Sequence, residues 1–191
     1  MSRRITFIFD ALKFANATAY LAGRCADLTK MKLSKLLFFA DKAHLLWYGR
    51  PVIGDRYIKM EYGPVPSSAY NLIKRDDRAT AEDQEVFDHF LLVDGNDIKA
   101  KLPPDLNYLS ETDVEALDFV LDKYGHLTPA QLSKLSHNDP AWREADMNGD
   151  IDYRLLLVED ETMSQMVEAD QELRDALEQV EVEELLASLR S

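Results

Sequence analysis

The chain contains little cysteine and little glycine. Among 191 residues there are one cysteine, Cys25, and seven glycines. A single thiol can form neither a disulfide framework nor a cysteine-based metal cluster, which is typical of proteins in a reducing cytoplasm. No glycine is followed by lysine and no GxGxxG occurs, which argues against the familiar phosphate-binding loops. The sequence therefore predicts a protein without a nucleotide or other cofactor.

Long uninterrupted hydrophobic runs are also missing. The segment from Met1 to Phe14 carries two arginines and then apolar side chains, which is how an export signal begins. Asp10 and Lys13 interrupt the apolar stretch before it reaches the length of a signal core or a membrane span. We therefore expect neither export nor membrane insertion, and the sequence predicts a cytoplasmic protein.

Positive charge is scarce and unevenly distributed. The chain has 22 lysine and arginine residues against 35 aspartate and glutamate residues, a net charge of −13. Residues 1–75 carry 13 basic and 5 acidic side chains (+8), residues 76–158 carry 7 and 19 (−12), and residues 159–191 carry 2 and 11 (−9). A negative average favours solubility and repels nucleic acid phosphates. The asymmetry either steers a charged protein partner or belongs to an ordinary solvated surface.

Apolar residues recur at intervals of three and four, the spacing of one helix face, along much of the chain. This spacing predicts a first helix over much of Phe7 to Leu21 and a central helix over Met31 to Tyr48. Gly49 and Pro51 would stop the central helix, whose apolar surface is wide enough to need neighbours on several sides. The sequence thus predicts a compact, mainly α domain with a minor β part.

Helix-start signals are clear further along the chain. Ser110 to Asp113 resembles a capping box, in which short side chains accept the free amides of the first turn. Thr128 to Gln131 repeats the device with a proline at the first helical position, and Asp139 can cap a third, shorter helix. Pro66 can begin a helix from Ser67 to Lys74, because a missing amide donor costs nothing in the first turn.

Strand signals are fewer. Two apolar segments, Phe90 to Val93 and Ile98 to Leu102, flank the turn residues Asp94 to Asp97, which predicts a small β-hairpin. The glycine-rich and proline-rich stretch from Pro51 to Val65 indicates extended pieces and turns, with Tyr57 to Glu61 as a strand.

The C-terminal part is acidic and differs in character from the rest. From Glu161 onward the pattern predicts a long acidic helix with two apolar stripes that are offset from each other. We therefore divide the chain into a domain of residues 1–158 and an acidic helical extension of residues 159–191. The extension either packs as an ordinary C-terminal helix or engages a partner.

Metal-binding patterns are not found in the sequence. The histidines are scattered and form no i, i+4 pair (His44, His89, His126 and His137). Asp146 to Asp152 alternates acidic and amide side chains as a calcium loop does, but Ile151 stands where such a loop needs glycine and Leu157 where it needs glutamate. We therefore predict no metal site.

One local group of residues could carry catalysis. His137 with Asp139 could act as a base and its orienting group, with Ser136 as the nucleophile. The alternative is a structural histidine, because neighbours in a helix-capping turn point in divergent directions. We favour the structural interpretation and predict a protein that is not an enzyme. A hydrolytic enzyme that uses His137 stays as the enzymatic alternative.

Nucleic acid binding is a further alternative. Four lysines lie in one region, with aromatic side chains close behind them (Lys30, Lys32, Lys35, Lys42, Trp47, Tyr48, Tyr57 and Tyr62). Basic residues interleaved with rings can hold a nucleic acid strand. Residues 128–142 could form a helix-turn-helix, but Lys134 is the only basic side chain there, with Arg143 next to it, too little charge for a recognition helix. Binding to the promoter of its own operon therefore stays a secondary possibility.

Three separated segments resemble the motifs of one family. They are KLLFFAD at Lys35 to Asp41, YGPV at Tyr62 to Val65, and SHNDPAW at Ser136 to Trp142. Motifs of this kind in this order resemble the Panacea domain, the SocA-like antitoxin family of bacterial and phage toxin–antitoxin pairs. The similarity covers roughly Met31 to Arg143.

This resemblance implies a cytoplasmic antitoxin that neutralises a cognate protein toxin by direct contact. Some members of the family are similar to proteolytic adaptors that deliver the toxin to an ATP-dependent protease, so such a protease is a second expected partner. A stable complex that occludes or distorts the toxin needs no catalytic group. The motifs are then a scaffold, and the choice of toxin rests on other surface residues.

The candidate site residues fall into two groups. We predict partner contacts on the loop surface around Tyr48, Arg50, Tyr57, Tyr62 and Tyr70, since buried aromatic anchors supply affinity in protein complexes. For each of these, core packing is the alternative. The motif residues are instead expected to be structural (Lys35, Phe39, Asp41, Gly63, Pro64, His137, Asp139 and Trp142).

Overall fold

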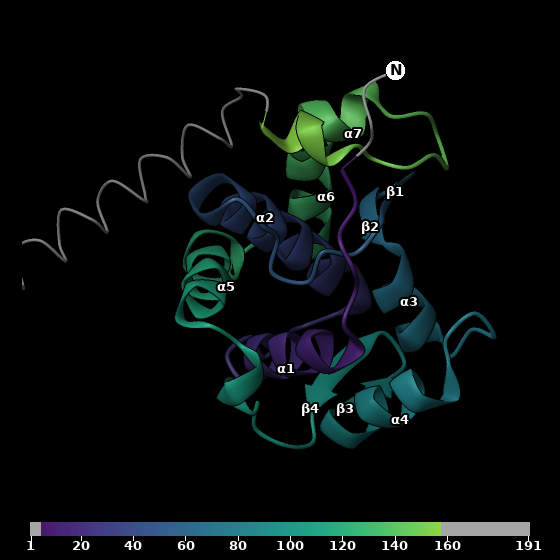
Figure 1. The fold of residues 1–191 in the computed structure, drawn as a ribbon, viewed down its shortest axis with the longest axis vertical. Helices are drawn as coiled ribbons and strands as arrows, with labels where there is room; N and C mark the ends of the chain where they lie inside the picture. The colour runs from purple at the N-terminus through teal and green to yellow at the C-terminus, as the bar shows by residue number, and fades with distance from the viewer. Residues whose placement is uncertain (1–4, 158–191) are drawn as a thin grey trace, which may run out of the picture. The chain divides into compact units, whose positions relative to one another are not determined.

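The structure, a computed structural model, describes residues 5–157 (Figure 1). The predicted acidic extension of residues 159–191 lies outside the described residues. The described part is mainly helical, as predicted, and has two small antiparallel hairpins, of which the sequence predicted one. Its elements, in chain order, are α1 (Ala11–Ala22), α2 (Lys30–Tyr48), β1 (Tyr57–Met60), β2 (Gly63–Pro66), α3 (Ser67–Lys74), α4 (Ala81–Phe90), β3 (Leu91–Asp94), β4 (Asp97–Ala100), the 3₁₀ turn η1 (Leu106–Tyr108), α5 (Glu111–Tyr124), α6 (Pro129–His137), α7 (Pro140–Glu144) and the 3₁₀ turn η2 (Tyr153–Leu157).

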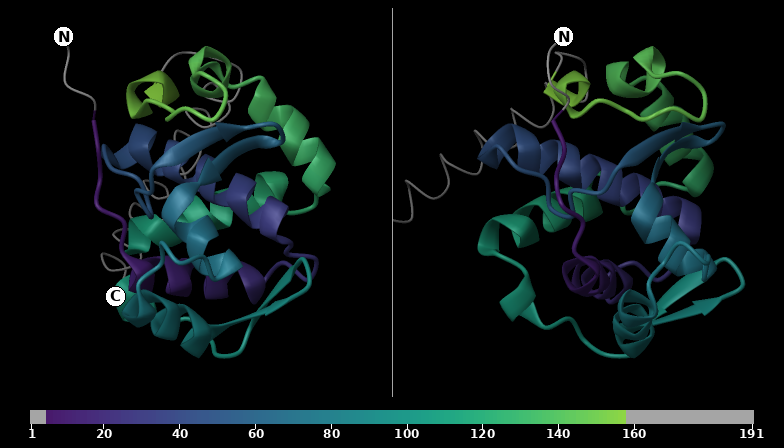
Figure 2. Two further views of the ribbon diagram at one scale, coloured as in Figure 1. Left: turned by 90° about the vertical axis from the view of Figure 1, so that its right-hand side faces the viewer. Right: turned by 45° about the vertical axis from the view of Figure 1, so that its right-hand side comes forward.

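Helix α2 is the centre of the fold. Every residue from Lys32 to Leu45 is buried, and the helix packs against α5, α6, β2 and η2. Figure 2 shows α2 crossing the middle of the molecule between α1 and α6. The predicted end at Tyr48 is confirmed, because Gly49 adopts the left-handed conformation with φ 72° and donates its amide to the Leu45 carbonyl, and the helix begins one residue before the predicted start. The predicted burial on several sides is confirmed as well.

The start signals predicted for three helices, at Ser110, Thr128 and Asp139, are also confirmed. Reciprocal capping boxes join Ser110 to Asp113 at the start of α5 and Thr128 to Gln131 at the start of α6. The Asp139 carboxylate accepts the amide of Ala141 at the start of α7. Each of these signals is satisfied within four residues, which explains why the sequence alone predicted them.

The predicted first helix is confirmed over most of its range, but the residues from Phe7 to Asp10 do not belong to it. Helix α1 begins at Ala11, because the Asp10 side chain accepts the amides of Leu12 and Lys13 and so caps the helix. Ile8 belongs to an extended segment before the helix and is 94% exposed. Its spacing to Leu12 is therefore coincidental.

Helix α4 was not predicted. It is capped by Thr80, and among its residues only Phe87 is buried. With one buried residue, the helix has almost no apolar periodicity that a sequence pattern could detect.

The two hairpins differ in how far they could be predicted. The β3–β4 pair closes around Gly95 and Asn96, which confirms the predicted hairpin. Pairing of β1 with β2 was not predicted, because β2 contains Pro64 and Pro66, and prolines are depleted in strands. Pro66 is the last residue of β2 and the residue before α3, with an extended ψ of 114°, so it does not occupy the predicted first helical position.

Within residues 5–157, no helix combines the length and the apolar character that a membrane crossing requires.

Candidate partner-binding site

The central helix carries buried charges. Lys32, Lys35, Asp41 and Lys42 are each at most 1% exposed. Ionised groups inside a protein are costly unless hydrogen bonds or opposite charges compensate them. Their compensating contacts therefore show which segments α2 holds in place.

Lys42 and Asp139 form an ion pair in the core. The Lys42 ammonium lies 2.7 Å from the Asp139 carboxylate, and both side chains are 0% exposed. The same carboxylate caps α7 through the amide of Ala141 at 2.8 Å. Because the two residues are 97 positions apart, this pair links the first motif, KLLFFAD and the residue that follows it, to the third motif, SHNDPAW.

Lys35 links the first motif to the second. Its ammonium donates to the Pro64 carbonyl at 2.8 Å, beneath the β1–β2 hairpin. Gly63 leaves the space for this contact, since a Cβ there would lie 2.8 Å from Lys35 Cε and 2.3 Å from Ser136 Oγ. Burial lowers the pKa of Lys35 from its ordinary value of 10.5 to about 7.

Replacement of Lys35 by methionine is expected to flatten the pH dependence of stability above neutral pH. The folded-state pKa of about 7 lies below the ordinary value of 10.5, so the unfolded chain binds more protons between these values. The free energy of unfolding of the unmodified protein should therefore rise with pH in this window, by at most about 1.4 kcal/mol per pH unit from this group. Urea denaturation at several pH values in the window measures the slope.

Lys123→Met is the matched control, because Lys123 is exposed on α5. This variant should keep the slope of the unmodified protein. An unchanged slope in Lys35→Met would contradict the assignment of this pH dependence to Lys35.

Asp41 holds the loop that follows α2. Its carboxylate accepts the amides of Ile53 at 2.8 Å and Gly54 at 3.2 Å, and the hydroxyls of Tyr57 at 3.1 Å and Tyr153 at 3.4 Å. Burial raises the pKa of Asp41 to about 7, although these donors favour the charged form. The site thus fixes residues 53–57 against α2 and η2.

Phe39 and the remaining motif residues also have structural surroundings. The Phe39 ring is 0% exposed and packs against Tyr124 at 4.9 Å between ring centroids. His137 stacks on Trp142 with centroids 4.0 Å apart. The Trp142 indole donates to the Met60 carbonyl at 3.2 Å and lies beneath the Lys59 ammonium, at 4.4 Å. Trp142 is only half-buried, so it packs on the outer side of the β1–β2 hairpin and not within the core.

The residues of the hydrolytic alternative make contacts of a structural kind. Ser136 Oγ donates to the Ser133 carbonyl at 2.8 Å. The Asp139 carboxylate binds Lys42, and the His137 ring stacks on Trp142. Desolvation lowers the pKa of His137. Within residues 5–157, no group of three or more His, Cys, Asp or Glu side chains is arranged to hold a metal ion.

The lysines that suggested nucleic acid binding lie mostly inside the protein. Lys32, Lys35 and Lys42 are at most 1% exposed, and of that group Lys30 alone reaches the surface. A buried ammonium cannot contact a phosphate backbone. These lysines are therefore close in the sequence because they belong to the buried helix α2, and they do not form a basic surface.

The five predicted partner contacts do not share one surface. Tyr57 is 1% exposed and donates to Asp41, so its side chain is not accessible to a partner in this structure. Tyr48, the last residue of α2, is 37% exposed and donates its hydroxyl to Glu115 on α5. Arg50 binds Asp113 Oδ1 at 2.8 Å beside it.

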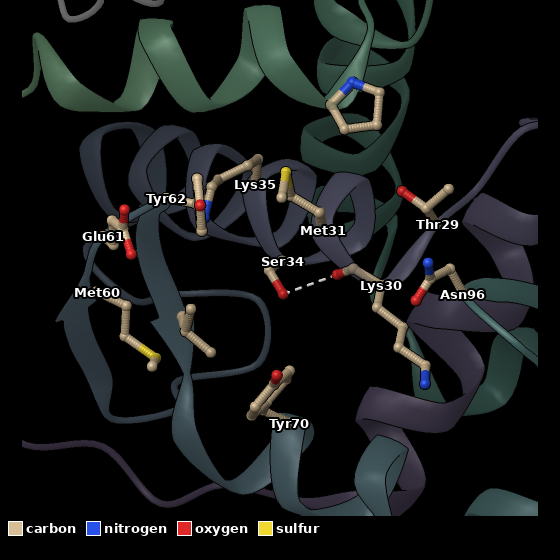
Figure 3. A pocket seen from close by; sticks show the side chains of 12 residues that line it. Thr29, Lys30, Met31, Ser34, Lys35, Met60, Glu61, Tyr62, Tyr70 and Asn96 are labelled. Carbon is tan, nitrogen blue, oxygen red and sulfur yellow. Dashed lines mark hydrogen bonds between the residues drawn. The ribbon is translucent and has the colours of Figure 1, made fainter.

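Tyr62 and Tyr70 lie near the opposite end of α2 and line one pocket (Figure 3). The two ends of this 19-residue helix are about 27 Å apart at the usual rise per residue. The pocket has a volume of about 500 Å³ and a mainly apolar lining. It is formed by the start of α2, the β1–β2 turn, α3, the β3–β4 turn and the start of α6. We call it the Met–Tyr pocket, after Met31, Met60, Tyr62 and Tyr70 in its wall.

Sequence reasoning selected the two tyrosines of this pocket but missed the pocket itself. Met31 and Met60 come from elements that are far apart in the sequence, and Met31 does not belong to the apolar stripe of α2. The available signal was Met31 itself, because an apolar side chain outside the stripe of a central helix can face a second neighbour or a cavity.

The buried contacts define a small helical domain in which three motifs, separated in sequence, meet around one charged core. A family model described as "Antitoxin SocA-like, Panacea domain" matches residues 33–143, which is more than half of the chain and includes all three motifs. The chain therefore belongs to this family of antitoxin-like proteins. Comparisons with curated proteins and with solved structures found no match. Family membership supports an antitoxin-type role and favours a role without catalysis.

Proposed function

We propose that this protein is an antitoxin that neutralises a cognate protein toxin by binding it directly. The observation that carries the proposal is the family match over residues 33–143. In this proposal, residues 1–158 are the antitoxin domain and residues 159–191 are an acidic extension. The buried ion pair of Lys42 and Asp139 and the contacts of Lys35 and Asp41 support a scaffold role for the motifs, because they serve packing and leave the surface free to contact a partner.

Co-expression with the product of the adjacent gene tests the proposal. That product alone should arrest growth, and this chain should restore growth and purify with it as a stable complex. Gly63→Ala is the matched negative control, since it is expected to destabilise the domain without changing its surface charge. The proposal would be contradicted if co-expression of this chain restored growth with the product of neither neighbouring gene.

The lifetime of the toxin separates two modes of neutralisation. A proteolytic adaptor shortens that lifetime only when this protein and an ATP-dependent protease are both present. A simple inhibitor leaves the toxin intact and inactive. A pulse-chase measurement in cells with and without the protease distinguishes the two modes.

A further inference from the structure

The Met–Tyr pocket has walls suited to an apolar side chain from another protein. Met31, Val65 and Tyr70 contribute to its wall, together with two residues that are considerably exposed, Met60 at 38% and Tyr62 at 59%. Covering such apolar surface removes it from water, which is favourable. Methionine side chains adapt to irregular partners, and tyrosines are enriched at protein interfaces. A volume of about 500 Å³ is large enough for more than one side chain.

The pocket also has polar groups at its rim. Lys30 stands at one side and Glu61 at the other, with Met31 and Ser34 between them in Figure 3 and Met60 on the Glu61 side. Within residues 5–157, no ion pair or hydrogen bond involves the Lys30 ammonium, the Glu61 carboxylate or the hydroxyls of Tyr62 and Tyr70. These groups are therefore available to a partner without the loss of an internal contact.

The Lys30 side of the pocket is the more strongly polarised. Lys30 is the first residue of α2, a helix of 19 residues capped by Thr29. The positive end of the helix dipole therefore adds to the charge of the ammonium, and both favour an anionic group. Glu61 lies on a hairpin turn, where no helix dipole reinforces its charge. Charge complementarity thus selects a carboxylate for the Lys30 side.

We propose that the Met–Tyr pocket is where the toxin docks, through a segment in which an apolar side chain lies next to an acidic one. This inference rests on the proposed function and adds the chemistry of the contact. The apolar side chain enters between Tyr62 and Tyr70, and the carboxylate pairs with Lys30. Burial of the apolar anchor supplies most of the affinity, whereas the charge pair raises the rate of association and the selectivity.

Binding of the purified toxin to surface variants tests the inference. Tyr62→Ala and Tyr70→Ala should each raise the dissociation constant by tenfold or more, and Lys30→Glu by about tenfold with slower association at low salt. The matched controls are Tyr108→Ala, because Tyr108 is 46% exposed on η1, and Lys123→Glu, because Lys123 is exposed on α5. Both controls should bind within about threefold of the unmodified protein. Thermal unfolding of each variant confirms that the fold is kept.

The acidic residue of the toxin can be found by charge reversal. Replacing it with lysine should weaken binding to the unmodified antitoxin and restore binding to Lys30→Glu. Failure of every acidic residue of the toxin to show this exchange would overturn the predicted charge pair.

Methionine methyl NMR locates the contact directly. The signals of Met31 and Met60 should shift when the toxin is added. If they shift instead with the concentration of the antitoxin alone, a second copy of this chain occupies the pocket and the inference is overturned. If the toxin binds while these signals and the three pocket variants behave as the controls do, the pocket is not the docking site, although the proposed function stands. If no toxin binds and growth is not restored, both fail.

Discussion

Replacement of Asp139 by alanine is expected to lower the free energy of unfolding by about 3–5 kcal/mol, the usual loss when one partner of a buried ion pair is removed. The reason is the Lys42 ammonium, which is 0% exposed and would lose the carboxylate that lies 2.7 Å away. The same replacement removes the side-chain cap of α7. Urea denaturation followed by circular dichroism measures the change.

Asp94→Ala is the matched control for this prediction. Asp94 pairs with Lys99 at 2.8 Å, a similar distance, but the two side chains are 65% and 56% exposed. Exposed ion pairs are screened by solvent and contribute little to stability, so the control should unfold almost as the unmodified protein does. Replacing both Lys42 and Asp139 with uncharged residues should recover part of the loss, because both charges of the buried pair are then removed together. Equal losses for Asp139→Ala and Asp94→Ala would show that the buried pair is not important for stability.

Replacement of Gly63 by alanine is expected to be comparably severe, at roughly 3–5 kcal/mol from backbone strain and overpacking together. Gly63 has φ 102°, a conformation that residues with a Cβ rarely adopt. A Cβ there would also lie 2.3 Å from Ser136 Oγ and 2.8 Å from Lys35 Cε. Either the buried side chains of Ser136 and Lys35 or the hairpin itself would have to shift. Thermal and urea denaturation of the variant measure the loss.

Gly95→Ala is the control that separates the two causes of the loss in Gly63→Ala, backbone strain and steric overlap of the new Cβ. Gly95 has a positive φ of 61°, but nothing lies within 4 Å of the position of its Cβ. Its replacement should therefore cost only the conformational part, about 1–2 kcal/mol. Adding Ser136→Ala to Gly63→Ala removes the closest contact and should restore some stability. The explanation would be refuted by a Gly63→Ala variant that is no less stable than Gly95→Ala.

The sequence predicted what is decided locally. The C-terminal end of α2 and the starts of α5, α6 and α7 follow from capping residues whose partners lie within four residues. The β3–β4 turn follows from its own short sequence. The family was predicted from motifs that are themselves short and contiguous. These features need no knowledge of which segments meet in space.

Features that depend on distant contacts were not predicted. Four nearby lysines suggested a basic surface, but Lys35 and Lys42 bind groups 29 and 97 positions away and lie in the core. Tyr57 resembled a surface aromatic until its contact with Asp41 was known. The Met–Tyr pocket draws on separate helices and turns, so no stretch of sequence contains it. In each case the chemistry of the residue was visible, but its surroundings were set by tertiary packing.

The long separation between Lys42 and Asp139 has a consequence for the nascent chain. The two residues are 97 positions apart, so at ordinary rates of synthesis the aspartate leaves the ribosome roughly 5 to 20 s after the lysine. During that interval the Lys42 ammonium on α2 cannot contact the Asp139 carboxylate. The contact between α2 and the third motif can therefore form only after translation has passed Asp139, so this part of the core is completed late in the synthesis of the chain.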